Sequence, residues 1–198
     1  MATIVEYRGI EGLVYAEVTE DTDGNYTTGE VKSLAGVQEL TKTTETSSET
    51  HFYDNIPAVI ITGQGSDEVS MNTSAIPLHT LADITSQYYD EATGMLVEGD
   101  RENKYYALGY RTQMTDNSEV LVWRLKGQFN TPDSTHATKD DGTDANGQEL
   151  VYTGISTTHK FTKNGKPARG IVVKAENVDA STFFDTVMTP DSVKAKTV

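Results

Sequence analysis

The sequence predicts a mainly β fold, in which a β-sandwich or partly open barrel carries one flanking α-helix and a short C-terminal helix. Thr and Gly are abundant, and Leu or Ala seldom recur at helical spacing, which favours strands and turns over a helix bundle. The 198 residues are enough for one domain with a real core, so we expect a single domain over residues 1–198. The hydrophobic fraction of 36% is lean for a monomer that must fill its core alone.

The N-terminal region is predicted to form a strand, a turn and a returning strand. Residues 13–18 are predicted to form the first strand, because five of the six are apolar or aromatic. The turn-forming residues 21–25 end it, and the chain returns over residues 29–34.

A polar segment at about residues 36–55 is the most unusual part of the chain. It is rich in Thr, Ser and Glu and, after Gly36, contains neither Gly nor Pro. Two interpretations compete: a disordered loop, which the composition permits, or an extended arm or hairpin that becomes ordered by packing on another subunit. The second is favoured, because β-branched Thr stiffens the chain and a flexible linker would usually contain Gly or Pro. The candidate inter-subunit residues are Thr41, Lys42, Thr43, Thr44, Glu45, Thr46 and Glu49.

Two buried strands and a helix are predicted next. The apolar run at residues 59–61 indicates a buried strand over residues 58–63, and residues 68–72 form its neighbour after a turn at residues 64–67. Pro77 marks the start of a helix. Apolar residues then follow at three- and four-residue steps, which indicates one buried helical face made of Leu78, Leu81, Ile84 and Tyr88.

The clearest strands follow Gly94. Residues 105–112 and 121–126 alternate, and a turn at residues 115–118 joins them into a hairpin with one apolar and one mixed face. Further strands are expected over residues 150–161 and 171–173. The core candidates from the helix and this hairpin are Leu81, Ile84, Tyr106, Leu108, Tyr110, Leu121, Trp123 and Leu125.

The C-terminal region is predicted to end the domain with a short helix. Asp179 is a suitable cap for its start, Phe183 and Phe184 lie within it, and Pro190 ends it. We expect the polar tail, residues 191–198, to fray.

No arrangement of residues indicates catalysis, a cofactor or a strong metal site. The chain has no Cys, which excludes thiolate chemistry, and its four His lie outside known metal-ligand spacings. Residues 132–147 are rich in Asp and Gly and offer only a weak cation site, with Asp140, Asp141 and Asp144 as candidates. Glycine motifs that bind phosphate are missing from the sequence. We therefore expect a protein that is not an enzyme and holds no cofactor.

The charge and the hydropathy narrow the range of partners. A formal net charge of −14 opposes tight binding of nucleic acid, because the surface would on average repel phosphates. The first ten residues contain no basic stretch followed by an apolar run, so no signal peptide is expected. No apolar stretch approaches the roughly 20 residues that span a bilayer. We expect synthesis in the cytoplasm and no membrane partner.

Several segments share their order and character with one protein family. They are His51-Phe52-Tyr53-Asp54-Asn55, Leu78 to Thr85, Asp90 to Glu98, Tyr105 to Tyr110, and Val122 to Phe129. Together, in this order and at this chain length, they resemble the siphophage major tail protein family, the tail-tube subunits of phages with long non-contractile tails. The resemblance covers the chain from about residue 13 to residue 161.

The resemblance implies a tail-tube-like fold of two packed β-sheets with a flanking helix. It also implies stacked hexameric rings whose inner sheets line a channel for the double-stranded DNA genome. An anionic wall would let DNA slide past without sticking. The implied partners are further copies of the chain and the tape-measure, distal-tail and tail-terminator proteins. The implied location is the virion tail, after synthesis in the cytoplasm of the bacterial host.

Other functions stay open at this point. The tube of a phage-tail-like bacteriocin or of a gene-transfer particle would use the same kind of subunit. A monomeric β-sandwich binding module would use Tyr-rich strands as a ligand platform, but Tyr106 and Tyr110 share the alternation of Leu108, which indicates the core. A hydrolase with paired carboxylates is a third class, for which no set of residues stands out.

Overall fold

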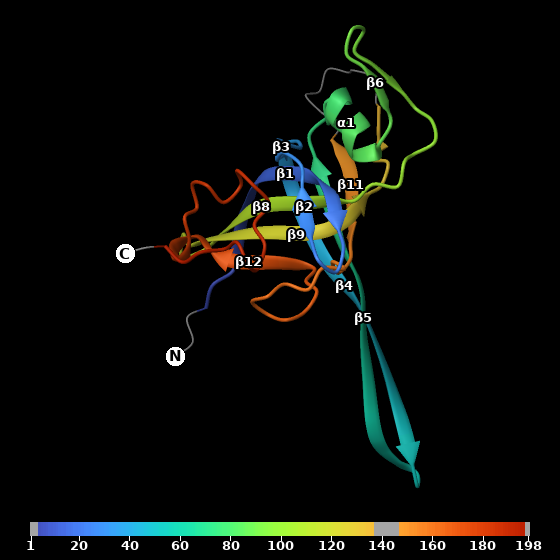
Figure 1. Cartoon of the computed structure of the whole chain (residues 1–198), viewed down its shortest axis with the longest axis vertical. Helices are drawn as coiled ribbons and strands as arrows, with labels where there is room; N and C mark the ends of the chain where they lie inside the picture. Colours follow the sequence, from blue (N-terminus) through green and yellow to red (C-terminus); the bar gives the residue numbers. More distant parts are fainter. Residues whose placement is uncertain (1–3, 137–146, 197–198) are drawn as a thin grey trace, which may run out of the picture.

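The chain is a mainly β protein built around one large antiparallel sheet (Figure 1). This computed structural model describes residues 4–136 and 147–196. In chain order the elements are β1 (Tyr7–Asp21), β2 (Tyr26–Thr28), β3 (Lys32–Ser33), β4 (Val37–Tyr53), β5 (Ile56–Thr73), α1 (Leu78–Thr85), β6 (Tyr88–Asp90), β7 (Met95–Val97), β8 (Tyr106–Met114), β9 (Glu119–Phe129), β10 (Asp133–Ser134), β11 (Gln148–Gly154), β12 (Gly170–Lys174) and the 3₁₀ turn η1 (Ala175–Asn177). The prediction of a mainly β fold with one flanking α-helix is therefore confirmed.

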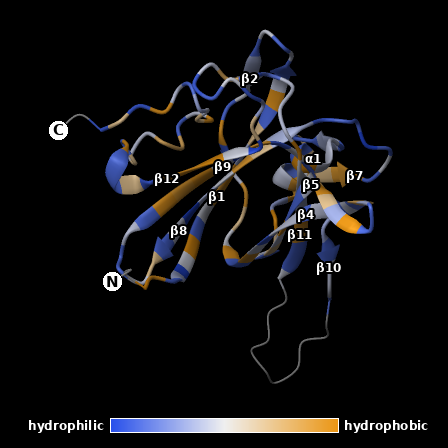
Figure 2. Cartoon of the chain, turned by 90° about the horizontal axis from the view of Figure 1, so that it is seen from below, coloured by the Kyte–Doolittle hydropathy of each residue, from blue (hydrophilic) through white to orange (hydrophobic). Residues whose placement is uncertain are grey.

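The ten-stranded sheet curls without closing. Its main strand order is β2-β1-β8-β9-β11-β5-β4, and β12 adds to β9. Seen from below, β1, β8, β9 and β12 lie on one side and β11, β5 and β4 on the other (Figure 2). The far strand β4 comes back into contact with β1, yet no strand ladder joins the two in the described part of the chain. The result is a partly open barrel with a seam between β1 and β4.

Both faces of the β8–β9 hairpin are buried. Tyr106, Leu108 and Tyr110 lie inside the curl, in a cluster with aromatic residues from the other strands. Leu121 and Trp123 point to the opposite face, into a second cluster. The sequence predicted one apolar and one mixed face, which is wrong because the C-terminal segment, including Phe183 and Val187, covers the second face. The core candidates that are buried are Ile84, Tyr106, Leu108, Tyr110, Leu121, Trp123 and Leu125.

The helix α1 is shorter than predicted, and its buried face differs. It begins after Pro77 and ends at Thr85, and the next residue, Ser86, adopts a left-handed conformation with a φ of 56°. Ile84 is buried and Leu81 is partly buried, whereas Leu78 is 52% exposed. Tyr88 lies outside the helix because the chain has already turned into β6.

The C-terminal segment forms turns where a helix was predicted. The carboxylate of Asp179 accepts a hydrogen bond from Ser181 N, at 3.1 Å, which closes a local turn instead of capping a helix. The carbonyl oxygen of Phe183 accepts a hydrogen bond from Trp123 Nε1 at 3.2 Å. The tail is also held down: Asp191 accepts bonds from the backbone of residues 162 and 163, where the sequence suggested fraying. Packing on Trp123 outweighs the weak helical preference of this segment.

We expect Trp123→Ala to lower the free energy of unfolding by about 3–5 kcal/mol, because it empties a fully buried site and leaves the Phe183 carbonyl without its donor. Urea titration followed by circular dichroism measures this loss. Val172→Ala is the matched control: Val172 is 60% exposed on the adjacent strand β12, so the loss should be under about 1 kcal/mol. Equal losses for the two variants would show that this second cluster does not stabilise the fold.

Candidate assembly surface

The strands β4 and β5 form a hairpin that extends well beyond the body of the protein (Figure 1). The inner part of β5, residues 67–73, pairs with β4 on one side and with β11 on the other. Residues 56–66 of β5 pair with β4 alone. At a rise of about 3.3 Å per residue, this stretch carries the tip about 35 Å from the sheet. We call residues 46–64 the distal ribbon.

The tip of the distal ribbon is a two-residue turn. Asp54 and Asn55 have φ angles of 51° and 62°, and Tyr53 pairs with Ile56 across the turn. Positive φ at both central residues is the pattern of the tight hairpin turn that matches strand twist, and Asp and Asn tolerate it well. Residues 37–53 are extended in β4, as expected of an arm or hairpin at residues 36–55, and they form only the first half of the hairpin. That this segment packs on another subunit stays a prediction.

The second half differs from the prediction of two buried strands joined by a turn. β5 is a single strand of 18 residues. The residues expected to form a turn, 64–67, contain a β-bulge instead, where Gly65 and Ser66 both lie opposite Glu45. The Glu45 carboxylate accepts a hydrogen bond from the Ser66 hydroxyl at 3.0 Å. A Cβ on Gly65 would lie 2.8 Å from Glu45 Cβ, which is too close for ordinary contact, so a larger residue here would force the two strands apart.

Both faces of the distal ribbon expose apolar side chains. Partners across a hairpin point to the same face and neighbours along a strand to opposite faces, so Ile60 lies on one face and Val59 and Ile61 on the other. The prediction that these three residues are buried is wrong: they are 45–65% exposed in the single chain. The exposed apolar residues of the ribbon are Phe52, Tyr53, Ile56, Val59, Ile60 and Ile61.

A ribbon of this kind is not a self-sufficient structure. A two-stranded hairpin on its own is at best marginally stable in water, because it has no third strand and no covered face. Exposed apolar patches of this size mark surfaces that bind other molecules. The distal ribbon is therefore the candidate functional surface of the chain.

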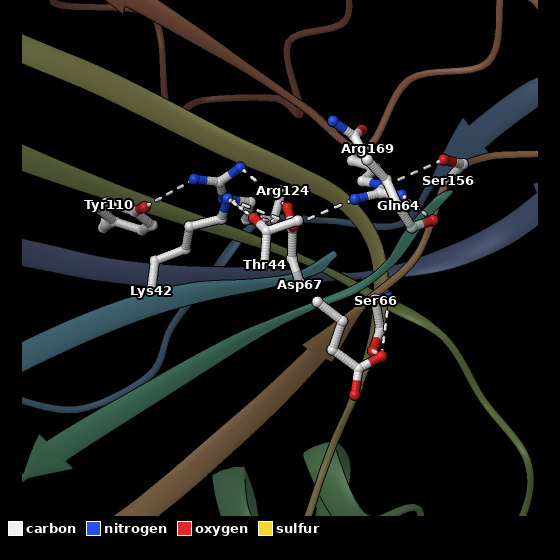
Figure 3. A network of polar contacts seen from close by, with 10 residues as sticks. Lys42, Thr44, Gln64, Ser66, Asp67, Tyr110, Arg124, Ser156 and Arg169 are labelled. Atoms are coloured by element: carbon white, nitrogen blue, oxygen red, sulfur yellow. Dashed lines mark hydrogen bonds and ion pairs between the residues drawn. The ribbon is translucent and has the colours of Figure 1, made fainter. Parts of the chain in front are cut away.

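An ionic network around a buried carboxylate holds the base of the hairpin (Figure 3). The side chain of Asp67 is only 4% exposed and lies where β5 loses its second partner. It accepts a hydrogen bond from the Thr44 hydroxyl at 2.8 Å. Lys42, Arg124 and Arg169 each bring a nitrogen within 3.4 Å of its carboxylate. These partners come from β4, from β9 and from the segment that leads into β12, so one carboxylate ties the hairpin to the body.

The network carries an excess of positive charge. One carboxylate faces three cations, which leaves two positive charges unbalanced within it. Arg124 also approaches the Tyr110 hydroxyl at 3.4 Å, and Arg169 donates to the carbonyl oxygen of Gln64 at 2.9 Å. The bond from Arg169 fixes Gln64, at the base of the distal ribbon, to the body.

The charges of the network shift the titration of Asp67. Burial alone would raise the pKa of this carboxyl, because it disfavours the charged form. The hydrogen bond from Thr44 and the positive charges of Lys42 and Arg124 outweigh burial and hold the pKa of Asp67 below its usual value of 3.8. The carboxylate is therefore ionised throughout the neutral range.

The candidate residues from the sequence fall into two groups. Thr41, Lys42, Thr43 and Thr44 pair within the sheet at the base, where Glu45 lies at the bulge, whereas Thr46 and Glu49 lie on the distal ribbon. The apolar residues of the ribbon were not among the candidates; the signal for them was an apolar run directly after an Asp-Asn turn. The cation candidates Asp140, Asp141 and Asp144 lie outside the described residues. Over residues 4–136 and 147–196, no group of three or more His, Asp or Glu side chains could hold a metal ion.

Comparisons with known proteins add no family to this description. No protein-family model matches the chain, and no curated protein matches it. Among the described helices, none is long and apolar enough to cross a membrane. The fold and the surface thus define the chain only by class, as a β-rich protein with a projecting hairpin that exposes apolar side chains on both faces.

We expect Asp67→Asn to lower the free energy of unfolding by about 2 kcal/mol at pH 7, because three partly exposed cations lose the buried carboxylate that they share. Denaturant titration measures this loss. Because the pKa of Asp67 is lower in the folded state, its contribution is present above the unfolded pKa of about 3.9 and disappears as the pH falls through the folded value. The difference between the wild type and the variant should therefore narrow below about pH 4.

The matched control for this prediction is Asp54→Asn, the same chemical change at the exposed tip of the hairpin. It should leave the stability of the single subunit nearly unchanged. A stability difference for Asp67→Asn that stays constant from pH 7 to pH 2 would contradict the role given to the carboxylate charge.

Proposed function

We propose that this protein is a non-enzymatic structural subunit that assembles with copies of itself into the tube of a long, non-contractile phage tail. The tube would consist of stacked hexameric rings around a channel that conducts the DNA genome. The observation that carries the proposal is the distal ribbon, which projects from the body with apolar side chains exposed on both faces. In a tube built from one protein, the neighbours of each subunit are copies of the same chain, so a copy is the partner we propose for the ribbon.

The energetics favour burial of the ribbon against neighbours. Full burial of a large apolar side chain is worth about 1.5–3 kcal/mol, and the six exposed apolar residues of the ribbon are each roughly half to two-thirds exposed. Covering them would gain about 7 kcal/mol per subunit. Immobilising a protein on association costs about 4–15 kcal/mol. The ribbon therefore offsets much of that cost, and lateral contacts between bodies must supply the rest.

The charge supports the second part of the proposal, the passage of DNA. A subunit with a net charge of −14 gives an assembled tube a strongly negative potential. Phosphates gain affinity from cations that release counterions, and an acidic wall denies them that gain. DNA would then move through the channel without specific or lasting contacts.

In this proposal the protein belongs to the virion, and its partners beyond other copies are the tape-measure, distal-tail and tail-terminator proteins. The tube of a phage-tail-like bacteriocin or of a gene-transfer particle would follow from the same ribbon and the same charge. The monomeric binding module loses its main support, because the Tyr side chains of its supposed platform, Tyr106 and Tyr110, are buried in the core.

We expect electron microscopy of the concentrated protein to show tubes or stacked rings with a central hole. The matched variant replaces residues 47–63 with Asn-Gly, which closes a two-residue turn directly between the paired residues Thr46 and Gln64. It should keep the folded body, with a free energy of unfolding within about 1 kcal/mol of the wild type, but form no tubes.

A second variant separates ribbon length from ribbon chemistry. Phe52→Thr with Ile60→Thr keeps the hairpin but makes one of its faces polar, and it should also impair assembly. Normal tubes from the shortened variant would show that the ribbon is only a surface loop. A wild-type protein that stays monomeric at high concentration, even with tail initiator proteins present, would contradict the proposed function itself.

A further inference from the structure

A groove at the seam of the barrel has the right chemistry to receive the hairpin tip of another copy. It encloses about 820 Å³ between the start of β1, the base of β4 and the faces of β8 and β9. Its apolar lining includes Ile10, Leu40, Tyr110 and Val122. Val172 on β12 extends this lining and is 60% exposed. The groove is therefore an apolar surface that opens from the core cluster to the outside.

One end of the groove is positively charged. Lys42 and Arg124 line it, and both belong to the network in which three cations share Asp67. The Nε atom of Arg124 is buried and has no hydrogen-bond partner within the described residues. Arg8 is a third cation in the lining of the groove. Among the residues that the structure describes, Glu39 is the single acidic one in that lining. In a chain with a net charge of −14, this end of the groove stands out as an excess of cations.

The hairpin tip has the complementary chemistry. Phe52, Tyr53 and Ile56 are each 62–65% exposed around the turn. Asp54 lies at the turn itself, and the distal ribbon, residues 46–64, contains two carboxylates and no Lys or Arg. The tip is thus an apolar knob that ends in a negative charge.

We infer that the hairpin tip of one copy docks in the seam groove of another copy. The aromatic and aliphatic side chains of the tip then cover the apolar lining, and Asp54 lies at the end formed by Lys42 and Arg124. This inference rests on the proposed self-assembly and names the contact through which it occurs.

The distance between the two surfaces determines the kind of assembly. The tip lies about 35 Å from the sheet that holds the groove, on a straight ribbon that points away from the body (Figure 1). A copy therefore cannot fill its own groove. Tip and groove are different surfaces, so each contact is head-to-tail and leaves one free tip and one free groove. Such a contact propagates from copy to copy, as the stacking of rings requires.

The test uses cross-linking between copies, which is straightforward because the chain has no Cys. Ala58→Cys places a thiol beside the tip, and Val172→Cys places one in the groove. The two variants are mixed, assembled and treated with a short thiol-specific cross-linker. The control pairs Ala58→Cys with Val97→Cys, an exposed site on β7, whose partner β6 lies at the end of the molecule away from the hairpin.

In assembled particles, we expect the tip-to-groove product to exceed the control product by about tenfold or more, because docking raises the effective concentration of the two thiols. Particles that form normally but link residue 58 to residue 172 no better than to residue 97 would overturn the docking contact and leave the proposed function standing. If no particles form from the wild type under any condition, both the docking contact and the proposed function fail.

Removal of the charge at the tip gives an independent readout. Asp54→Asn keeps the turn, since Asn also accepts positive φ. It should raise the protein concentration needed for assembly by about three- to tenfold at low salt. The difference should shrink at high salt, where charges are screened. The control Asp23→Asn changes an exposed acid in the turn between β1 and β2 and should have no effect. Equal assembly by Asp54→Asn and the wild type at low salt would contradict the docking geometry.

Discussion

The buried carboxylate of Asp67 lies where β5 changes from a strand with two neighbours to a strand with one. Its contacts with Lys42, Arg124 and Arg169 join the hairpin to two other parts of the sheet. A charge in this position is costly unless it is paired, so the four side chains hold one another in place. The direction of the distal ribbon, and with it the position of every apolar side chain on the tip, follows from this fixed base.

The body buries its apolar side chains, whereas the ribbon exposes them. The body is stable because two clusters bury both faces of β8 and β9, one inside the curl and one beneath the C-terminal segment. The ribbon has neither a third strand nor a covered face, and its apolar side chains are exposed to water in the single chain. The lean hydrophobic composition is thus shared between a core that the chain completes by itself and an exposed surface that the proposed assembly would cover.

Much of the fold could be predicted from local patterns, and the failures have physical causes. Alternation located β8 and β9, and the stiff Thr-rich segment indicated β4. Gly65 suggested a turn, but the glycine is needed for close contact with Glu45 at a bulge, and local sequence does not separate these roles. The apolar run at residues 59–61 indicated a buried strand, but these residues are 45–65% exposed, because an apolar run does not say whether the strand has a covered face. The C-terminal helix failed because Trp123 and Phe183 make a long-range contact that local preference ignores.

Hydrogen exchange of the backbone amides in the distal ribbon, residues 46–64, tests the central claim most directly. In the free subunit we expect these amides to exchange quickly, because a two-stranded ribbon opens easily, while residues 67–73 stay protected between β4 and β11. In assembled particles we expect exchange in the ribbon to slow by on the order of 100-fold or more, since each ribbon becomes enclosed by neighbours. Particles in which the ribbon exchanges as quickly as in the free subunit would contradict the claim that the protein assembles through its hairpin.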